Sequence, residues 1–256
     1  MPVTCQCDGA VATVVLSNPA RMNAMTRGMW RELAEVFAQL SLDADLRVVV
    51  VRGQGDHFCA GGDISEYPAF RFERASLRAF HEDEVWGGLS AVLACPVPVL
   101  AQIDGNCMGA GVEIASCCDI RIASDRAQFG APIAKLGFPM APREAQLVAS
   151  RVGLGLAAEW LLEAAVLPVG RLHALGFVNA VVAPEDLAEQ VNVRALRVAA
   201  MSPLAARGNK AMLRALSQPG ADVEAWVSQA YDYAADPQHR EGIEAFLDKR
   251  TPRFSP

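Results

Sequence analysis

Four consecutive valines at 48–51 place the strongest constraint on how this 256-residue chain can fold. A β-branched run of this kind, ended by Gly53, is typical of a strand that is apolar on both faces. Such a strand has to be covered on both sides by other elements. A second apolar segment at 97–103 has the same character, and segments with helical spacing lie between them. This alternation predicts an α/β fold in which helical crossovers join parallel strands.

The rest of the chain extends this pattern. Residues 3–7 and 10–19 predict two strands joined by a tight turn at Asp8 and Gly9. Further helices are expected at 25–40, 73–93 and 109–118, and further strands at 119–123 and 177–183. Beyond Arg143 the pattern is otherwise helical. The length suits one main domain with a smaller appendage, so we expect a core at 1–195 and a helical C-terminal region at 196–256.

Composition excludes several classes of function. The net charge is −6 and the basic residues are scattered, which argues against a nucleic-acid partner. The seven cysteines lack a disulfide-scaffold spacing and the N-terminus lacks a signal segment, so we expect a cytoplasmic protein. Without CxxC pairs or clustered histidines, no metal site is expected. The longest apolar segment, 89–103, contains two prolines and is shorter than the ~20 residues that span a membrane.

Two loops after predicted strands expose backbone N–H groups. In the first, Ala60, Gly61 and Gly62 leave the backbone bare enough for a ligand to touch it, although a plain tight turn capped by Asp63 would have the same sequence. In the second, Gly109 precedes a helix whose first N–H groups have no partner within the helix and carry partial positive charge. An oxyanion would therefore be favoured there.

Glu113 lies in the first turn of that second helix, three residues after Ala110. Its carboxylate and the Ala110 N–H are therefore expected on one helix face. A first-turn glutamate also complements the helix dipole, by roughly 0.3–1 kcal/mol. Glu113 is, however, the only charged residue between Asp104 and Asp119, which predicts burial, a raised pKa and a role in proton transfer.

At this point the sequence resembles the crotonase family, also called the enoyl-CoA hydratase/isomerase family. The resemblance runs nearly from end to end and rests on the segments NPARMNAM (18–25), HFCAGGDI (57–64), IDGNCMGAGVEIASCCDIRIAS (103–124), AQFGAPIAKLG (127–137) and EGIEAFLDKRTPRF (241–254). It implies a spiral of ββα units with a helical C-terminal region that assembles as a homotrimer or homohexamer. It also implies an acyl-CoA substrate, with coenzyme A present only as part of that substrate and no separate cofactor.

The resemblance also assigns roles to residues. Backbone N–H groups of Ala60 and Ala110 would hold the thioester oxygen as it becomes an enolate, and Glu113 would be the catalytic acid/base. Arg21 would contact the nucleotide end of CoA, and Phe246 and Lys249 would reach the CoA of a neighbouring subunit. The remaining residues expected to bind the substrate are Cys59, Gly61, Asp63, Ile64, Gly109 and Ile133.

The sequence departs from the family at Ile133, where hydratases carry a second glutamate. Nearby substitutes are few, because Lys135 is expected to point elsewhere, Ala141 has no acid, and Glu144 is expected simply to open a helix. Hydration uses one group to activate water and another to protonate Cα, so a single glutamate puts hydratase activity in doubt.

Three interpretations therefore stay open. The first is an enzyme of this family that forms an enolate with Glu113 as sole acid/base, either a hydratase or a double-bond isomerase. The second is a decarboxylase or thioester hydrolase, which would not need an acid at Ile133; His57 and Tyr67 flank the first loop and could serve a decarboxylase. The third is an acyl-CoA binder without turnover. Phe138, Met140 and Trp86 are candidates for the acyl pocket or for plain core residues.

Overall fold

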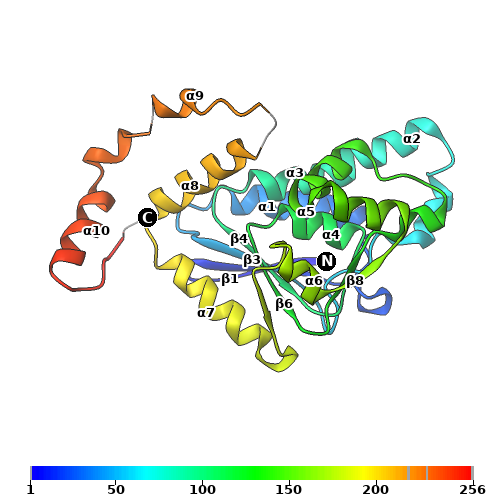
Figure 1. Ribbon diagram of the computed structural model, residues 1–256, viewed down its shortest axis with the longest axis horizontal. Helices are drawn as coiled ribbons and strands as arrows, with labels where there is room; N and C mark the ends of the chain where they lie inside the picture. The colour runs from blue at the N-terminus through cyan, green and yellow to red at the C-terminus, as the bar shows by residue number, and fades with distance from the viewer. Residues whose placement is uncertain (1, 218–219, 229, 255–256) are drawn as a thin grey trace.

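The main sheet has helices on both faces (Figure 1). The computed structural model describes residues 2–217, 220–228 and 230–254. In this part of the chain six strands form one sheet in the order β1-β2-β3-β4-β6-β9. Their bounds are β1 (Val3–Asp8), β2 (Val11–Leu16), β3 (Val48–Gly53), β4 (Val99–Ile103), β6 (Ile120–Ser124) and β9 (Ala180–Val182). The pairs from β2 onward are parallel, as the alternation predicted, whereas β1 and β2 form the predicted hairpin.

The valine run explains why the sheet is covered on both faces. Val49 and Val51 belong to the larger core cluster, whereas Val48 and Val50 belong to a second cluster on the opposite face. The helices of the described residues are α1 (Arg27–Leu40), α2 (Arg74–Ala79), α3 (Trp86–Ala94), α4 (Ala110–Cys117), α5 (Pro142–Leu162), α6 (Val169–Ala174), α7 (Leu187–Ala199), α8 (Pro203–Leu216), α9 (Glu224–Val227) and α10 (Pro237–Leu247). Helix α7 covers the second cluster, while α1, α3 and α4 pack in the larger one.

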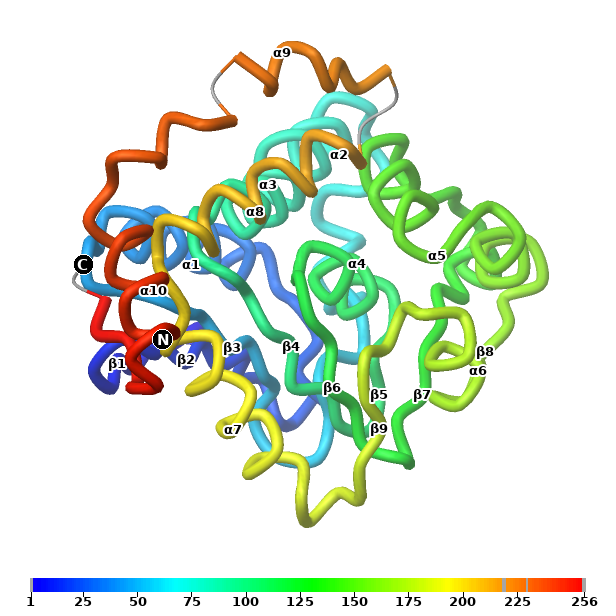
Figure 2. Tube along the Cα trace, turned by 60° about the vertical axis from the view of Figure 1, so that its left-hand side comes forward, coloured from blue at the N-terminus to red at the C-terminus, as the bar shows by residue number. Residues whose placement is uncertain are grey.

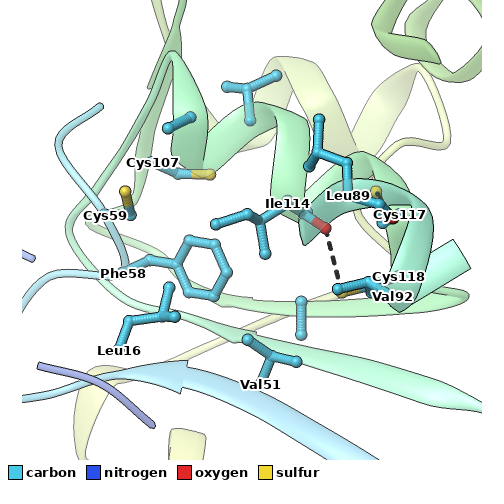
Figure 3. Packing of buried hydrophobic residues seen from close by; sticks show 14 of the residues in the cluster. Leu16, Val51, Phe58, Cys59, Leu89, Val92, Cys107, Ile114, Cys117 and Cys118 are labelled. Carbon is cyan, nitrogen blue, oxygen red and sulfur yellow. Dashed lines mark hydrogen bonds between the residues drawn. The ribbon is translucent and has the colours of Figure 1, made fainter. Parts of the chain in front are cut away.

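Beneath α4, the larger cluster is closely packed (Figure 3). Ile114 of α4 points toward Phe58, and both side chains are fully buried. Three buried cysteines, Cys59, Cys107 and Cys117, fill small spaces in the same cluster, and burial raises the pKa of each thiol. These cysteines therefore act as small apolar residues.

A second, smaller sheet is a feature that the sequence pattern missed. It consists of β5 (Asn106–Met108), β7 (Gln128–Gly130) and β8 (Val166–Pro168), in that order. Each strand has only three residues, too short for a period-two pattern to be recognised. The predicted helix at 73–93 is also divided, since the π-helical segment Phe80–Val85 lies between α2 and α3. The short 3₁₀ helices are Pro19–Arg21, Ile64–Ala69, Pro132–Leu136, Pro184–Asp186 and Asp232–Ala235.

Around the boundary predicted at residue 195, α7 continues to Ala199, and its Ala195 is packed against the sheet. From there, α8 and α9 lead to α10, which lies on the opposite side of the molecule from α5 (Figures 1 and 2). Among the described residues, no helix combines the length and the apolar character needed to cross a membrane.

A buried lysine attaches α8 to the core. Lys210 is 6% exposed; its ammonium group lies 2.7 Å from Oδ2 of Asp119 and also donates a hydrogen bond to the Val97 carbonyl. Asp119 in turn accepts a hydrogen bond from the Val99 N–H, at the start of β4. Burial lowers the pKa of Lys210, and the nearby Asp119 opposes this shift. The lysine therefore joins α8 to the end of the sheet.

Replacing Lys210 by Met should destabilise the protein. The substitution removes the partner of a partly buried carboxylate, and we expect a loss of about 2 kcal/mol in the free energy of unfolding. Urea titration followed by circular dichroism would measure it. Lys135→Met is the matched control, because Lys135 is exposed. Equal stabilities of the two variants would contradict the anchoring role.

Candidate active site

The two glycine-containing loops lie against each other. The Cys59 N–H donates to the Asn106 carbonyl at 2.9 Å, and the Met108 N–H donates to the Cys59 carbonyl at 2.8 Å. Residues after Cys59 therefore run alongside the end of β5. Gly61 and Gly109 have φ values of +114° and +47°, which favour glycine, and a Cβ added to Gly109 would lie 3.6 Å from the Cα of Gly61. The bare backbones predicted from the sequence are thus brought together.

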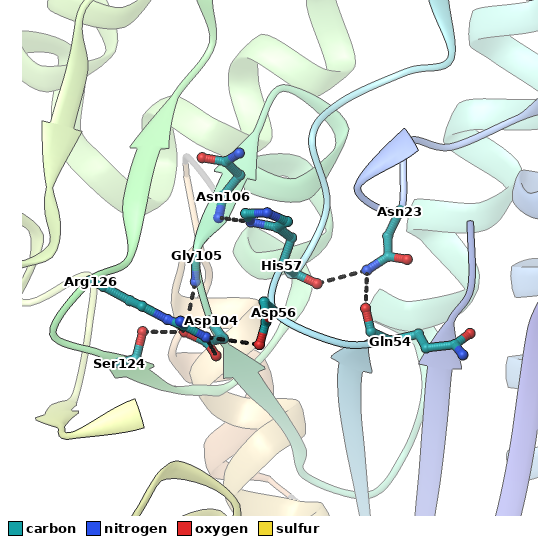
Figure 4. A network of polar contacts seen from close by, with 9 residues as sticks. All are labelled: Asn23, Gln54, Asp56, His57, Asp104, Gly105, Asn106, Ser124 and Arg126. Carbon is teal, nitrogen blue, oxygen red and sulfur yellow. Dashed lines mark hydrogen bonds and ion pairs between the residues drawn. The ribbon is translucent and has the colours of Figure 1, made fainter. Parts of the chain in front are cut away.

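A polar network below the loops holds this arrangement (Figure 4). Nε of Arg126 donates to Asp104 at 2.8 Å, and Asn23 donates to the His57 carbonyl at 2.7 Å. Nδ1 of His57 accepts the Asn106 N–H at 3.1 Å. His57 thus has a backbone partner in this network. It does not line the cavity that opens beside the two loops.

A cavity of about 190 Å³ opens beside the two loops. Seven of the predicted site residues line it: Ala60, Gly61, Ile64, Gly109, Ala110, Glu113 and Ile133. Tyr67, Phe138 and Met140 line it as well, whereas Trp86 does not. Trp86 instead packs its ring against the guanidinium of Arg143 at 5.5 Å. The structure therefore brings the two loops and Glu113 together at one cavity.

Glu113 is a buried carboxylate at the cavity, with 7% of its surface exposed. Every residue of α4 is buried, so the helix surrounds this carboxylate with small apolar neighbours. Burial raises the pKa of Glu113 well above its ordinary value, and the negative charge of Glu144 raises it further. Glu113 is therefore suited to carry a proton at neutral pH.

The two predicted oxyanion donors differ in their surroundings. Ala110 is the first residue of α4, and its N–H has no hydrogen-bond partner in the described part of the chain. The Ala60 N–H already donates to the Met22 carbonyl at 3.0 Å. Ala60 can therefore bind a ligand oxygen only by sharing its hydrogen or by giving up this bond. Sequence reasoning could not anticipate this bond, because it depends on the left-handed conformation of Met22, at φ +49°.

The other predicted binding residues lie outside the cavity lining. Cys59 is fully buried, and Asp63 caps the following 3₁₀ helix by accepting the Ser65 N–H at 3.1 Å. Asp63 therefore caps this helix, as one interpretation of the loop predicted, and its role in substrate binding stays a prediction. Arg21 is exposed at the end of its 3₁₀ helix. Phe246, 83% exposed, and Lys249 lie at the end of α10, on the far side of the molecule from α5 (Figures 1 and 2).

Sequence reasoning missed a second carboxylate in the cavity. Glu144 lies in the first turn of α5, as predicted, but it is only 3% exposed and lines the cavity. Its spacing held the missing signal, because Glu144, Leu147 and Val148 occupy positions i, i+3 and i+4 of one helix face and all three are buried. Lys135 is exposed and outside the lining, in agreement with its prediction.

Glu144 is hydrogen-bonded to another cavity residue. Its Oε1 lies 2.8 Å from Nδ1 of His81, and Nε2 of His81 lies 3.4 Å from Nη1 of Arg71. The Arg71 guanidinium lies over the rings of both Tyr67 and Phe138, 4.4 Å and 3.9 Å from their centroids. Burial raises the pKa of Tyr67 to about 12, so its phenol keeps its proton. Residues from four separate segments thus surround one cavity.

Comparison with known proteins agrees with this geometry. The family model described as enoyl-CoA hydratase/isomerase matches residues 6–256. The chain belongs to the enoyl-CoA hydratase/isomerase family. Crotonyl-CoA hydratase of Syntrophomonas wolfei is 31% identical over 255 residues, which cover 95% of this chain and 94% of that relative. The family is one of enzymes, so the expectation of an enzyme is confirmed at this level.

Solved structures of the family share the fold. A crystal structure of an enoyl-CoA hydratase/carnithine racemase from Magnetospirillum magneticum matches with a TM-score of 0.96 and 37% identity, covering 100% of this chain and 96% of that one. The enoyl-CoA hydratase of Bacillus anthracis matches with a TM-score of 0.90 and 26% identity, covering 99% of both chains. The predicted crotonase-like α/β fold with a helical C-terminal region is therefore confirmed.

The buried carboxylate should lower stability as the pH rises. Because the pKa of Glu113 is higher in the folded than in the unfolded chain, the folded state binds more protons above about pH 4.5, and Glu113 contributes less to stability as the pH increases. Glu113→Gln should therefore be more stable than the wild type at pH 8, by a margin that shrinks toward pH 5. Urea unfolding across this range measures the difference. Glu163→Gln is the control, because it makes the same substitution at an exposed position, and its effect on stability should not vary with pH in this way.

Proposed function

We propose that this protein is an acyl-CoA enzyme that forms and protonates an enolate at Cα of a thioester, with Glu113 as acid/base. One observation carries the proposal: Glu113, a buried carboxylate, and Ala110, whose N–H has no partner among the residues that the structure describes, lie on the first turn of α4 and line the same cavity. The family relatives are named as enoyl-CoA hydratases, which agrees with an acyl-CoA substrate.

The chemistry follows from charge development. When a proton leaves Cα, or when a nucleophile adds at Cβ, negative charge moves to the thioester oxygen. The Ala110 N–H, at the positive end of the α4 dipole, stabilises this charge mainly in the transition state, and such a donor contributes about 2.7–4 kcal/mol. Ala60 is the second donor in this proposal and must then share its hydrogen with the Met22 carbonyl. Glu113 moves the proton at Cα.

Binding of the CoA portion involves residues beyond the cavity. Arg21 is exposed and suits the phosphate groups of the nucleotide, since the chain as a whole is acidic. Phe246 and Lys249 are exposed at the end of α10, which lies on the opposite side of the molecule from α5, and so suit a site shared between subunits. We propose a homotrimer or homohexamer on this basis, working in the cytoplasm without a separate cofactor.

One observation favours a different reaction on the same enolate. Ile133 gives the cavity an apolar wall, which suits the release of CO₂ from a malonyl-type thioester, and Tyr67, a candidate residue for a decarboxylase, lines the same cavity. A decarboxylase is therefore the second candidate, and a thioester hydrolase or a binder without turnover would be separated from it by the same assays. Enoyl-, malonyl-type and saturated acyl-CoAs, followed by loss of the conjugated absorbance, CO₂ release and free thiol, distinguish these reactions.

Glu113→Gln tests the proton-transfer role. We expect whichever reaction responds to slow by roughly 10²- to 10⁴-fold, because glutamine has a similar shape but cannot transfer the proton. CoA affinity, measured by titration calorimetry, should stay within about threefold. The control Glu163→Gln should retain wild-type turnover. Full activity in Glu113→Gln would show that the acid/base assignment is wrong, and no CoA binding by the wild type would remove the whole proposal.

Ala110→Pro tests the oxyanion donor. Proline at the first helical position is tolerated because the lost N–H is not part of the helix ladder. We expect kcat to fall roughly 10²- to 10³-fold, as when one oxyanion donor is removed. Ala110→Gly keeps the N–H and serves as the matched control, with kcat within about tenfold of the wild type. Equal kcat values for the proline and glycine variants, both folded by circular dichroism, would contradict this role.

A further inference from the structure

The cavity contains a second carboxylate, that of Glu144, in addition to Glu113. Glu144 enters from α5, whereas Glu113 enters from α4, and both line the same space. They are close enough for the charge of Glu144 to raise the pKa of Glu113. Two buried carboxylates near each other are costly, because desolvation and like charge both oppose ionisation. Such an arrangement requires a stabilising partner for the charge of one of them.

His81 is that partner, and its tautomer follows from the neighbouring arginine. A guanidinium only donates hydrogen bonds, so the contact of Arg71 with Nε2 of His81 makes this nitrogen an acceptor. The ring proton then lies on Nδ1 and is donated to Oε1 of Glu144 at 2.8 Å. The order of donation is Arg71 to His81 to Glu144. A hydrogen bond donated to a carboxylate favours its ionised form.

The other oxygen of Glu144 is left for a ligand. In the part of the chain that the structure describes, Oε2 of Glu144 has no hydrogen-bond partner. The groups that face Glu144 are Glu113 from α4, His81 from the π-helical segment, Tyr67 from the 3₁₀ helix before α2, and Arg71 through His81. The two carboxylates thus have different environments, since Glu144 has a donor on one oxygen while Glu113 is enclosed in the apolar surroundings of α4. When two carboxylates have environments that differ in this way, one can act as an acid and the other as a base.

We propose that Glu144 is the second proton-transfer residue of this cavity, the base that activates water for addition to an enoyl-CoA, and that His81 and Arg71 position it. This inference rests on the proposed function, because it requires enolate formation with Glu113. Glu144 touches the reacting water, whereas His81 and Arg71 act only through it. The position occupied by Ile133 then needs no acid.

The proposed step balances in protons and electrons. Ionised Glu144 takes a proton from water while the oxygen of that water forms a bond to Cβ. The π electrons of the Cα–Cβ bond move to the thioester oxygen, where the Ala110 N–H stabilises the enolate. Protonated Glu113 then gives its proton to Cα, and the carbonyl re-forms. The proton now on Glu144 returns to Glu113 through water, so that the net change is addition of one water molecule.

Glu144→Gln separates this role from that of Glu113. Glutamine keeps the shape and can still accept the His81 proton, but it cannot take a proton from water. We expect hydration of crotonyl-, hexenoyl-, decenoyl- or cinnamoyl-CoA, whichever the wild type accepts, to slow at least about 10²-fold. Exchange of the Cα hydrogens of butyryl-CoA with deuterium oxide, followed by NMR, needs only one acid/base and should change by less than about tenfold, the change coming from the lower pKa of Glu113 once the charge of Glu144 is removed. Glu113→Gln should lose both activities, and Glu163→Gln neither.

The positioning role of His81 has a separate readout. His81→Phe keeps an aromatic ring of similar size but removes the donor, so ionised Glu144 loses its stabilising hydrogen bond. The rate of hydration should then rise with pH over a higher pH range than in the wild type, with a larger change in kcat than in KM. His81→Asn, whose amide can donate in place of Nδ1, should restore a profile close to the wild type. Thermal unfolding by circular dichroism verifies that each variant is folded.

Each outcome decides between the two proposals. Wild-type hydration rates in folded Glu144→Gln would overturn the role of Glu144, as would a wild type that exchanges Cα hydrogens but hydrates none of the four enoyl-CoAs. Either result would leave the proposed function of Glu113 intact. An unchanged pH profile in His81→Phe would overturn the positioning role. Absence of both Cα exchange and CoA binding in the wild type would overturn the proposed function, and this inference with it.

Discussion

The pairing of Cys59 with Cys107 is the interaction on which the site depends. Two backbone hydrogen bonds, from Cys59 to Asn106 and from Met108 to Cys59, align the loop after β3 with the short strand β5. Because these bonds lie in a fully buried position, they are shielded from competition with water. They bring Ala60 and Gly61 beside Gly109 and Ala110. Without this pairing the bare backbone of the two loops would have no common cavity to face.

The cavity also concentrates an electrostatic cost. Glu113 and Glu144 are both nearly inaccessible to water, yet of the two only Glu144 has a neighbouring donor for its charge among the described residues, in His81. Burial and the charge of Glu144 raise the pKa of Glu113, which suits it to proton transfer. The same shift lowers the stability of the folded protein at high pH, so the site gains function at the expense of stability. Arg71, which also lines the cavity and lies against the rings of Tyr67 and Phe138, is the first donor in this chain of hydrogen bonds. The two carboxylates therefore differ: Glu113 lies in the apolar packing of α4, whereas Glu144 accepts a hydrogen bond from His81.

Much of the fold could be predicted because strong local patterns coincide with the tertiary structure. The valines of β3 alternate between two clusters, so a wholly apolar strand required cover on both faces. The helix from Arg27 to Leu40 and the hairpin at Gly9 also follow from local spacing and turn chemistry. The strands β5, β7 and β8 could not be predicted, because three residues carry no period and their pairing is decided by contacts distant in sequence.

The same division applies to the site. The sequence by itself determined that Glu113 would be an isolated carboxylate at a helix start, three residues after a donor, since helical spacing alone places them on one face. It also identified both loops with exposed backbone and the apolar Ile133. Only the tertiary structure decided that the Ala60 N–H would be occupied by Met22 and that Glu144 would turn inward to meet His81. Those contacts join residues up to 63 positions apart, and no local pattern encodes which distant side chain will share a cavity.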